Sequence, residues 1–118
     1  MTATRCPFCD IVAGLAPATV LARWSDAIAI APIDPVTDGH VLVIPRVHVD
    51  DATEDPMVTA AVMQRAAEYA NVLGTPLNLI TSRGREATQS IFHLHIHVVP
   101  RAVGDGLPLP WTPQQAAA

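Results

Sequence analysis

The run Ser90-Ile-Phe-His-Leu-His-Ile-His-Val-Val-Pro-Arg101 decides the fold, because three histidines alternate in it with apolar residues. The apolar residues are mostly β-branched, which is typical of a β-strand. Side chains of a strand alternate between its faces, so we expect His93, His95 and His97 on one face and their apolar neighbours in the core. Alternate imidazoles then lie about 6.5–7 Å apart, close enough to share one small anion or metal ion. Because imidazole changes charge near neutral pH, such a cluster suits a nucleophile, acid or base.

The composition indicates a globular chain with a single core. Its 118 residues have room for one domain, expected over 1–118, and half of them are hydrophobic while only 15% are charged. The formal net charge of −4 argues against nucleic acid as a partner. No apolar run approaches the roughly 20 residues of a membrane span, and Met1–Cys6 lacks the apolar centre of a secretion signal. We therefore expect a cytoplasmic protein without a membrane partner.

Two cysteines lie close together as Cys6-Pro-Phe-Cys9. In a reducing cytosol this spacing suggests a metal clip or a redox pair more than a structural disulfide. A redox pair of this kind normally follows a strand and opens a helix, and nothing before Cys6 can form that strand. Half of a zinc site is the preferred interpretation, with an incidental pair as the alternative.

The order of expected elements is hairpin, strand, helix, strand, strand, which indicates an α+β fold with a mainly antiparallel sheet. Helix limits follow from capping residues, and strands from apolar runs that end at turn residues. We expect a short N-terminal helix at Asp10–Ala13, one long helix from Asp55-Pro56 to Gly74, strands at Thr19–Trp24, Ala27–Ala31, His40–Pro45 and Leu77–Thr81, and the histidine strand. The ends are an N-terminal segment with both cysteines (1–14) and a proline-rich tail (104–118), while Pro32–Gly39 and Ser82–Ser90 are loops.

Four motifs in a fixed order resemble the histidine triad (HIT) superfamily of nucleotide hydrolases and transferases, specifically its Hint-like branch. They are Cys-Pro-Phe-Cys near the start, the block Gly39–His48, the loop Gly84–Ser90 and the alternating histidines before Pro100-Arg101. The resemblance implies about five antiparallel strands with one long helix, closing into a ten-stranded sheet in a homodimer. It also implies a nucleotide or related phosphate ester as substrate.

The resemblance assigns the middle histidine, His95, as a nucleophile that attacks the α-phosphorus and forms a covalent nucleotidyl-histidine, which water then hydrolyses. His97 serves the phosphate or leaving group, and His40 helps set the protonation of the pair. Polar groups are expected to hold the phosphate and stabilise developing charge. The residues expected to bind substrate are Gln89, Ser90, Ser82, Gly84 and Trp111.

The same resemblance completes the zinc site. A closed tetrahedral site needs two ligands besides Cys6 and Cys9. The family pattern supplies His48, after the Pro45-Arg46 pair, and His93, the first histidine of the triad. His93 is then structural, zinc is the only cofactor expected, and no organic cofactor is implied.

The chain departs from the family pattern where ribose and phosphate are bound. Pro32 stands where relatives carry a ribose-binding aspartate, with Asp34 two residues later, and Ser82 replaces an asparagine. Ala87-Thr88 replaces a pair that is often glycine. Two alternatives therefore remain beside the hydrolase: a non-catalytic nucleotide- or partner-binding protein, and one metal centre for metal-dependent chemistry. Arg83 and Arg85 are expected to be solvated loop charges, with attraction of a polyphosphate as the alternative.

Overall fold

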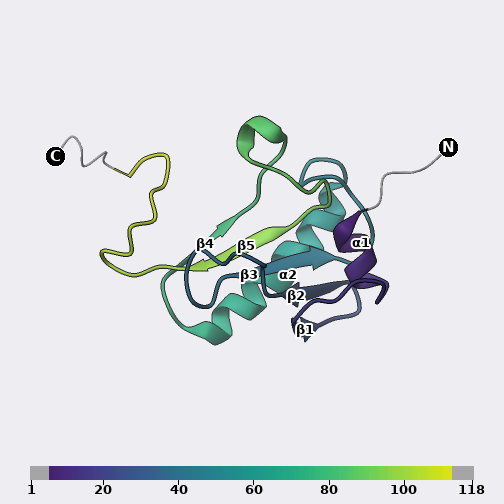
Figure 1. Ribbon diagram of the computed structural model, residues 1–118, viewed down its shortest axis with the longest axis horizontal. Coiled ribbons are helices and arrows are strands. Elements are labelled where there is room, and N and C mark those ends of the chain that lie inside the picture. Colours follow the sequence, from purple (N-terminus) through teal and green to yellow (C-terminus); the bar gives the residue numbers. More distant parts are fainter. Residues whose placement is uncertain (1–5, 113–118) are drawn as a thin grey trace.

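The computed structural model describes residues 6–112, and it contains a five-stranded antiparallel sheet with one long and one short α-helix (Figure 1). This confirms the expected α+β fold. Residues 1–5 of the expected N-terminal segment and 113–118 of the expected tail lie outside the described residues. The elements are α1 (Pro7–Val12), β1 (Val20–Arg23), β2 (Ala27–Ile30), β3 (Val41–Pro45), α2 (Pro56–Leu73), β4 (Leu77–Ile80), the 3₁₀ helix η1 (Arg85–Ala87) and β5 (Ile96–Pro100).

The strand order is β1-β2-β3-β5-β4, so the histidine strand β5 lies between β3 and β4. Alternation along each strand sends side chains to two separate cores. One core includes Val41, Val43 and Ile96 and lies beneath α2, which contacts β3 and β5. The other includes Leu42 and Ile44 and lies beneath α1. The two faces of the sheet are therefore distinct, and the histidines belong to the face that carries α1.

Helix α2 begins and ends where the sequence predicts. The Asp55 side chain caps it by accepting the backbone N–H of Met57 at 3.1 Å, and Pro56 occupies the first turn. Gly74 ends it with a φ of 67°, in the left-handed region that favours glycine. Its buried residues Val62 and Ala66 pack on the sheet, so the small alanine side chain allows close approach.

Helix α1 differs from the expected Asp10–Ala13, because it begins three residues earlier at Pro7. Cys6 is its N-cap, and the Cys6 sulfur accepts the backbone N–H of Cys9 at 3.3 Å. Proline suits the first helical position because its missing N–H would have no partner there. The first turn of α1 therefore lies between the two cysteines, which places Phe8 on the sheet.

Strand β5 also differs from expectation, because it begins at Ile96 and leaves His93 and His95 before the strand. Val43 pairs with Ile96, so continued pairing would set Pro45 opposite Leu94. Pro45 has no N–H to offer such a ladder. The N–H of Leu94 donates instead to the carbonyl of Val49 at 2.8 Å. Buried and partly exposed side chains still alternate from Leu94 to Val98, whereas His93 is buried like Leu94.

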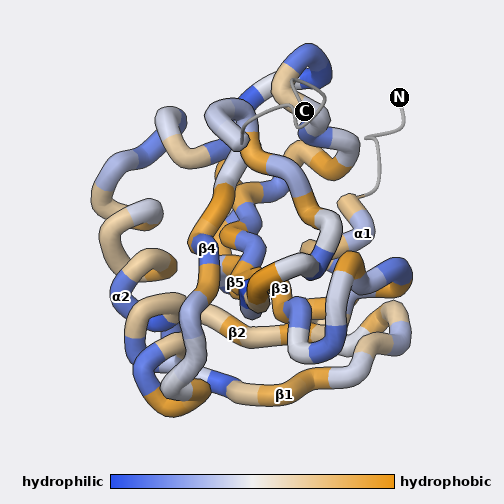
Figure 2. Tube along the Cα trace, turned by 90° about the vertical axis from the view of Figure 1, so that its left-hand side faces the viewer, coloured by the Kyte–Doolittle hydropathy of each residue, from blue (hydrophilic) through white to orange (hydrophobic). Residues whose placement is uncertain are grey.

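The two ends of the described chain lie at opposite ends of the sheet, with α1 at one and the tail beyond β5 at the other (Figure 1). Arg101 fastens the tail by donating to Asp105 at 2.7 Å and to Asn78 of β4 at 2.7 Å. Hydrophobic residues continue onto the edge strands β1 and β4 (Figure 2). The expected ten-stranded dimer sheet remains a prediction. Within residues 6–112, no helix has the length and hydropathy that crossing a membrane requires.

Candidate active site and metal centre

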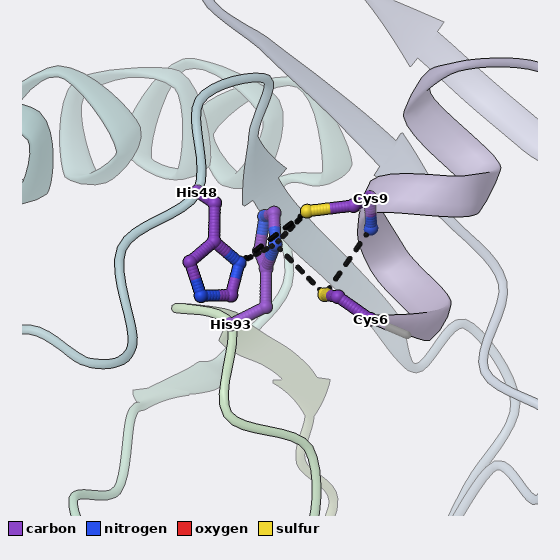
Figure 3. A group of neighbouring side chains, drawn as sticks. All are labelled: Cys6, Cys9, His48 and His93. Atoms are coloured by element: carbon purple, nitrogen blue, oxygen red, sulfur yellow. Dashed lines mark hydrogen bonds between the residues drawn. The ribbon is translucent and has the colours of Figure 1, made fainter. Parts of the chain in front are cut away.

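Cys6, Cys9, His48 and His93 come together from three parts of the chain, and we call this group the zinc clip (Figure 3). The cysteines lie on α1, His48 follows β3, and His93 precedes β5. The His93 Nδ1 lies 3.4 Å from the Cys6 sulfur and 3.6 Å from the Cys9 sulfur, and the His48 Nδ1 lies 3.3 Å from that of His93. Tetrahedral Zn–S and Zn–N bonds of about 2.3 and 2.0–2.1 Å imply edges of roughly 3.3–3.7 Å. These separations match such edges, and all four atoms lie within 4.8 Å of one another, so the donor set suits one zinc ion.

The outer nitrogens of both clip imidazoles bind acceptors, which orients their inner nitrogens toward the metal position. The Nε2 of His48 lies 2.9 Å from the Asp50 carboxylate, and the Nε2 of His93 lies 3.0 Å from the Pro45 carbonyl. Each Nε2 therefore carries the proton and donates it, leaving the Nδ1 lone pair free. Such outer partners are the usual support of zinc-bound histidine.

The Cys9 thiol needs a nearby cation to ionise at neutral pH. Burial and the neighbouring Cys6 raise the pKa of Cys9 to about 11. A thiol with such a pKa stays protonated at neutral pH, whereas zinc binds the thiolate and displaces the proton. When bound, zinc supplies structural cross-linking between α1 and the two histidine segments.

The other three histidines form a series whose tautomers are fixed by hydrogen bonds, with His40 bonded to His97 and His95 bonded separately to the backbone. The N–H of Val36 donates to the Nδ1 of His40 at 3.1 Å, so the proton of His40 is on Nε2, which donates to the Nδ1 of His97 at 3.0 Å. His97 therefore presents an Nε2–H donor. The Nδ1 of His95 lies 2.8 Å from the His93 carbonyl and donates to it, which leaves the Nε2 lone pair of His95 unprotonated. A nucleophile and a donor thus stand side by side, with ring centroids 5.1 Å apart.

Burial keeps this series neutral. It lowers the pKa of His95 and His40, and it lowers that of His97 to about 4, with the neighbouring His95 and His40 contributing. A buried imidazole resists protonation because the charged form loses its hydration. At neutral pH the lone pair of His95 is therefore available for attack on an electrophile.

The loop from Ser82 to Ser90 is held by Gln89, whose side chain is only 3% exposed. The Gln89 amide donates to the carbonyls of Asp50 at 2.7 Å and Ile91 at 3.1 Å, and its oxygen accepts the N–H of Gly84 at 2.9 Å. Both amide hydrogens are thus engaged within the protein. Gly84 has a φ of 91°, which only glycine adopts readily. In this arrangement Gln89 positions the loop.

Two cavities flank the histidines. One of about 780 Å³ lies beside α1 and reaches Ser90. It is lined mainly by apolar side chains, including Phe8, Ile11 and Pro32, and Asp34 also borders it. The second, of about 340 Å³, reaches His40, His97 and Ser82. Ser90 and Ser82, which are expected to contact phosphate, therefore each line one of the two cavities.

Three other residues singled out from the sequence lie at the surface. Trp111 is 76% exposed in the tail, so a single chain does not bury it against the histidines. Arg83 lies 4.0 Å from Asp51, and the Arg85 guanidinium lies 5.8 Å from the centre of the Phe92 ring. Both arginines are exposed, as the preferred interpretation expects, but Arg85 begins the short helix η1 and does not lie in an irregular loop.

Two residues that contact the site were not assigned from the sequence. Phe8 packs edge-on against both His93 and His95. Asp50 orients the clip through His48. The position of Phe8 between the two cysteines and the spacing of Asp50 two residues after His48 are the signals that point to them.

Comparison with known proteins agrees with this geometry. The HIT domain family model matches residues 13–104. An uncharacterized HIT-like protein from Mycobacterium tuberculosis is 40% identical over 108 residues, which cover 86% of this chain and 75% of that protein. An adenosine 5′-monophosphoramidase from Schizosaccharomyces pombe is 31% identical over 121 residues, covering 96% and 91% of the two chains. The protein therefore belongs to the HIT family, and its relatives place it at a coarse level among hydrolases.

A solved relative supports the metal assignment. The crystal structure of a zinc-bound histidine triad family protein from Mycobacterium smegmatis is 42% identical, has a TM-score of 0.75, and covers 88% of this chain and 80% of its own. Together with the donor set and geometry of the clip, this likeness identifies Cys6, Cys9, His48 and His93 as a structural zinc site.

Replacing Asp50 with asparagine tests its role at the zinc clip. Asp50→Asn should weaken zinc binding about 10- to 100-fold, because His48 loses the carboxylate that fixes its orientation. Zinc affinity measured by competition with a chromophoric chelator reads this directly. Asp38→Asn, the same change at an exposed loop position, is the control and should leave affinity unchanged. Equal affinity in all three proteins would contradict the role.

Replacing Gln89 with glutamate tests its role in holding the loop. Gln89→Glu should lower the free energy of unfolding by about 1–3 kcal/mol, because a carboxylate oxygen then faces two carbonyls that had accepted hydrogen bonds. Urea unfolding of the zinc-bound protein measures the loss. Gln64→Glu makes the same change on the exposed surface of α2 and should cost at most about 0.5 kcal/mol. Similar losses for both would argue against the positioning role.

The pH dependence of stability tests the buried state of His97. Its folded pKa of about 4 lies below the ordinary value of 6.5, so the unfolded chain binds the proton more readily. The stability contributed by neutral His97 is complete above pH 6.5 and is lost as the pH falls toward 4. Between pH 7 and pH 5, His97→Asn should therefore show a smaller fall in unfolding free energy than wild type. Parallel urea curves for both proteins would contradict this.

Proposed function

We propose that the protein is a hydrolase or nucleotidyl transferase that acts at the α-phosphorus of a nucleotide through a covalent nucleotidyl-His95. The observation that carries the proposal is the lone pair on the Nε2 of His95, fixed by the hydrogen bond from its Nδ1 to the His93 carbonyl. A buried neutral imidazole with this orientation is a competent nucleophile at neutral pH. The substrate classes are a nucleoside phosphoramidate, a dinucleoside polyphosphate or a related ester.

The reaction has two balanced steps. The Nε2 of His95 forms a bond to phosphorus while the bond from phosphorus to the leaving group breaks, and the leaving group departs with the bonding pair and takes a proton. His97 faces the reaction with its Nε2–H, which stabilises a phosphoryl oxygen or supplies that proton. Water then attacks phosphorus and gives a proton to the Nε2 of His97, if that nitrogen protonated the leaving group, or otherwise to solvent. The bond to His95 breaks, and the imidazole keeps the bonding pair as its lone pair.

The remaining expected contacts fit the same scheme. Ser90 and Ser82 offer hydroxyl donors to the phosphate from the two cavities, and His40 keeps His97 in the required tautomer. Gly84 and Gln89 act through the shape of the loop between them. A homodimer with one ten-stranded sheet remains part of the proposal, and Trp111 of each subunit then contributes to the site of the other.

The name of the S. pombe relative favours a phosphoramidate substrate. That protein is an adenosine 5′-monophosphoramidase, and this chain covers 91% of it. A second function is favoured by Pro32, which borders the larger cavity without a side-chain acceptor for sugar hydroxyls. This second candidate is a protein that binds a nucleotide or another partner on a HIT scaffold without catalysing a reaction.

Turnover of a substrate panel decides between the two. Adenosine phosphoramidate and diadenosine polyphosphates are offered to wild type, His95→Asn and the exposed control Phe92→Leu. We expect hydrolysis of at least one substrate, a loss of at least about 10³-fold in His95→Asn, and near-normal rates in Phe92→Leu. Intact-protein mass spectrometry after rapid mixing should find a nucleotidyl adduct in wild type only. Tight nucleotide binding by calorimetry without turnover would establish the binding function instead.

A further inference from the structure

Phe8 contacts both the zinc clip and the proposed nucleophile. Its ring centroid lies 5.8 Å from that of His93 with an interplanar angle of 83°, and 5.2 Å from that of His95 with an angle of 85°. Both are edge-to-face contacts, a geometry in which an aromatic pair contributes beyond simple burial. One side chain, 5% exposed, thus touches a metal ligand and the reacting imidazole at once.

The position of Phe8 depends on the zinc clip. Helix α1 has only six residues, and an isolated helix of that length does not persist in water. Its first turn is fixed by Cys6 and Cys9, which flank Phe8 and face His48 and His93 (Figure 3). The clip therefore determines where the Phe8 ring lies relative to the sheet.

Phe8 is also a wall of the larger cavity. Together with Ile11 of the same helix it lines the space that extends to Ile30, Leu42 and Ser90. Movement of α1 away from the sheet would open this wall and withdraw the ring from His95 in the same step. The clip, the nucleophile and the cavity are thus in contact through one side chain.

We propose that Phe8 is a positioning residue that couples zinc retention to the orientation of His95 and to binding of the substrate in the adjoining cavity. Coupling between two ligands is reciprocal, so a bound substrate must raise the affinity for zinc by the same factor by which zinc raises the affinity for the substrate. The link from the clip to His95 stands on contacts within the chain. The link to a bound nucleotide rests on the proposed function.

A second route from the clip to His95 passes through the backbone, because the His95 Nδ1 donates to the carbonyl of His93. A double-mutant cycle separates the two routes, since this hydrogen bond is present whether or not position 8 is aromatic. The cycle uses wild type, Phe8→Leu, His95→Asn and the double variant. Zinc affinity is measured in each by chelator competition, which needs neither turnover nor nucleotide.

We expect His95→Asn to weaken zinc binding by about 2- to 10-fold when Phe8 is present and by less than about 2-fold when it is leucine. Phe8→Tyr keeps the ring and should restore the dependence. Thermal melts establish that each variant is folded, and Phe8→Met replaces Phe8→Leu if the latter is not. Equal factors in the aromatic and aliphatic backgrounds would overturn the coupling through Phe8.

The nucleotide arm uses AMP as the probe with the zinc-bound proteins. We expect AMP to bind Phe8→Leu at least about 3-fold more weakly than wild type, and to slow zinc release in wild type but not in that variant. Phe92→Leu, an exposed aromatic beside His93, is the matched control and should resemble wild type. AMP binding that is unaffected by Phe8→Leu would overturn the link to the cavity. Coupling in the zinc cycle without any AMP binding by wild type would instead refute the proposed function and leave the coupling standing.

Discussion

The position of His93 is the constraint on which the rest of the site depends. Its imidazole is fully buried and spans two parts of the fold, with one nitrogen at the zinc clip and the other on the Pro45 carbonyl at the end of β3. Its own carbonyl holds the Nδ1 of His95. His93 therefore completes the metal site and links the segment before β5 to the end of β3, where the ladder stops. It also fixes which nitrogen of His95 is unprotonated.

These hydrogen bonds determine which nitrogen of each imidazole carries the proton. A neutral imidazole has a proton on only one of its two nitrogens, and its hydrogen-bond partners decide which nitrogen that is. Here the Val36 N–H fixes the tautomer of His40, and His40 in turn fixes that of His97. The His93 carbonyl fixes the tautomer of His95 by accepting its Nδ1–H. His95 and His97 consequently both present Nε2, unprotonated in His95 and protonated in His97, which are the states that the proposed nucleophile and donor require.

The zinc ligands His48 and His93 came from the resemblance to the HIT family, whereas sequence patterns were sufficient for the sheet and the long helix, because alternation and caps are local properties. They failed where a distant group decides the outcome. Alternation continues unchanged through His93 and His95, and only the missing N–H of Pro45 shows that the strand has not begun. Gln89 looked like a free donor, but its amide is occupied by carbonyls from two segments. The start of α1 was missed because a cysteine served as its cap.

The zinc clip also has a consequence for the order in which the chain folds during its synthesis. Cys6 leaves the ribosome well before His93, because the contact between them spans 87 positions. At about 5–20 residues per second, the N-terminal segment waits roughly 4–17 seconds for its partner. For that time its thiols are open to other metals and oxidants. Helix α1 is thus made before the strands it packs against, yet it is among the last elements to reach its final position.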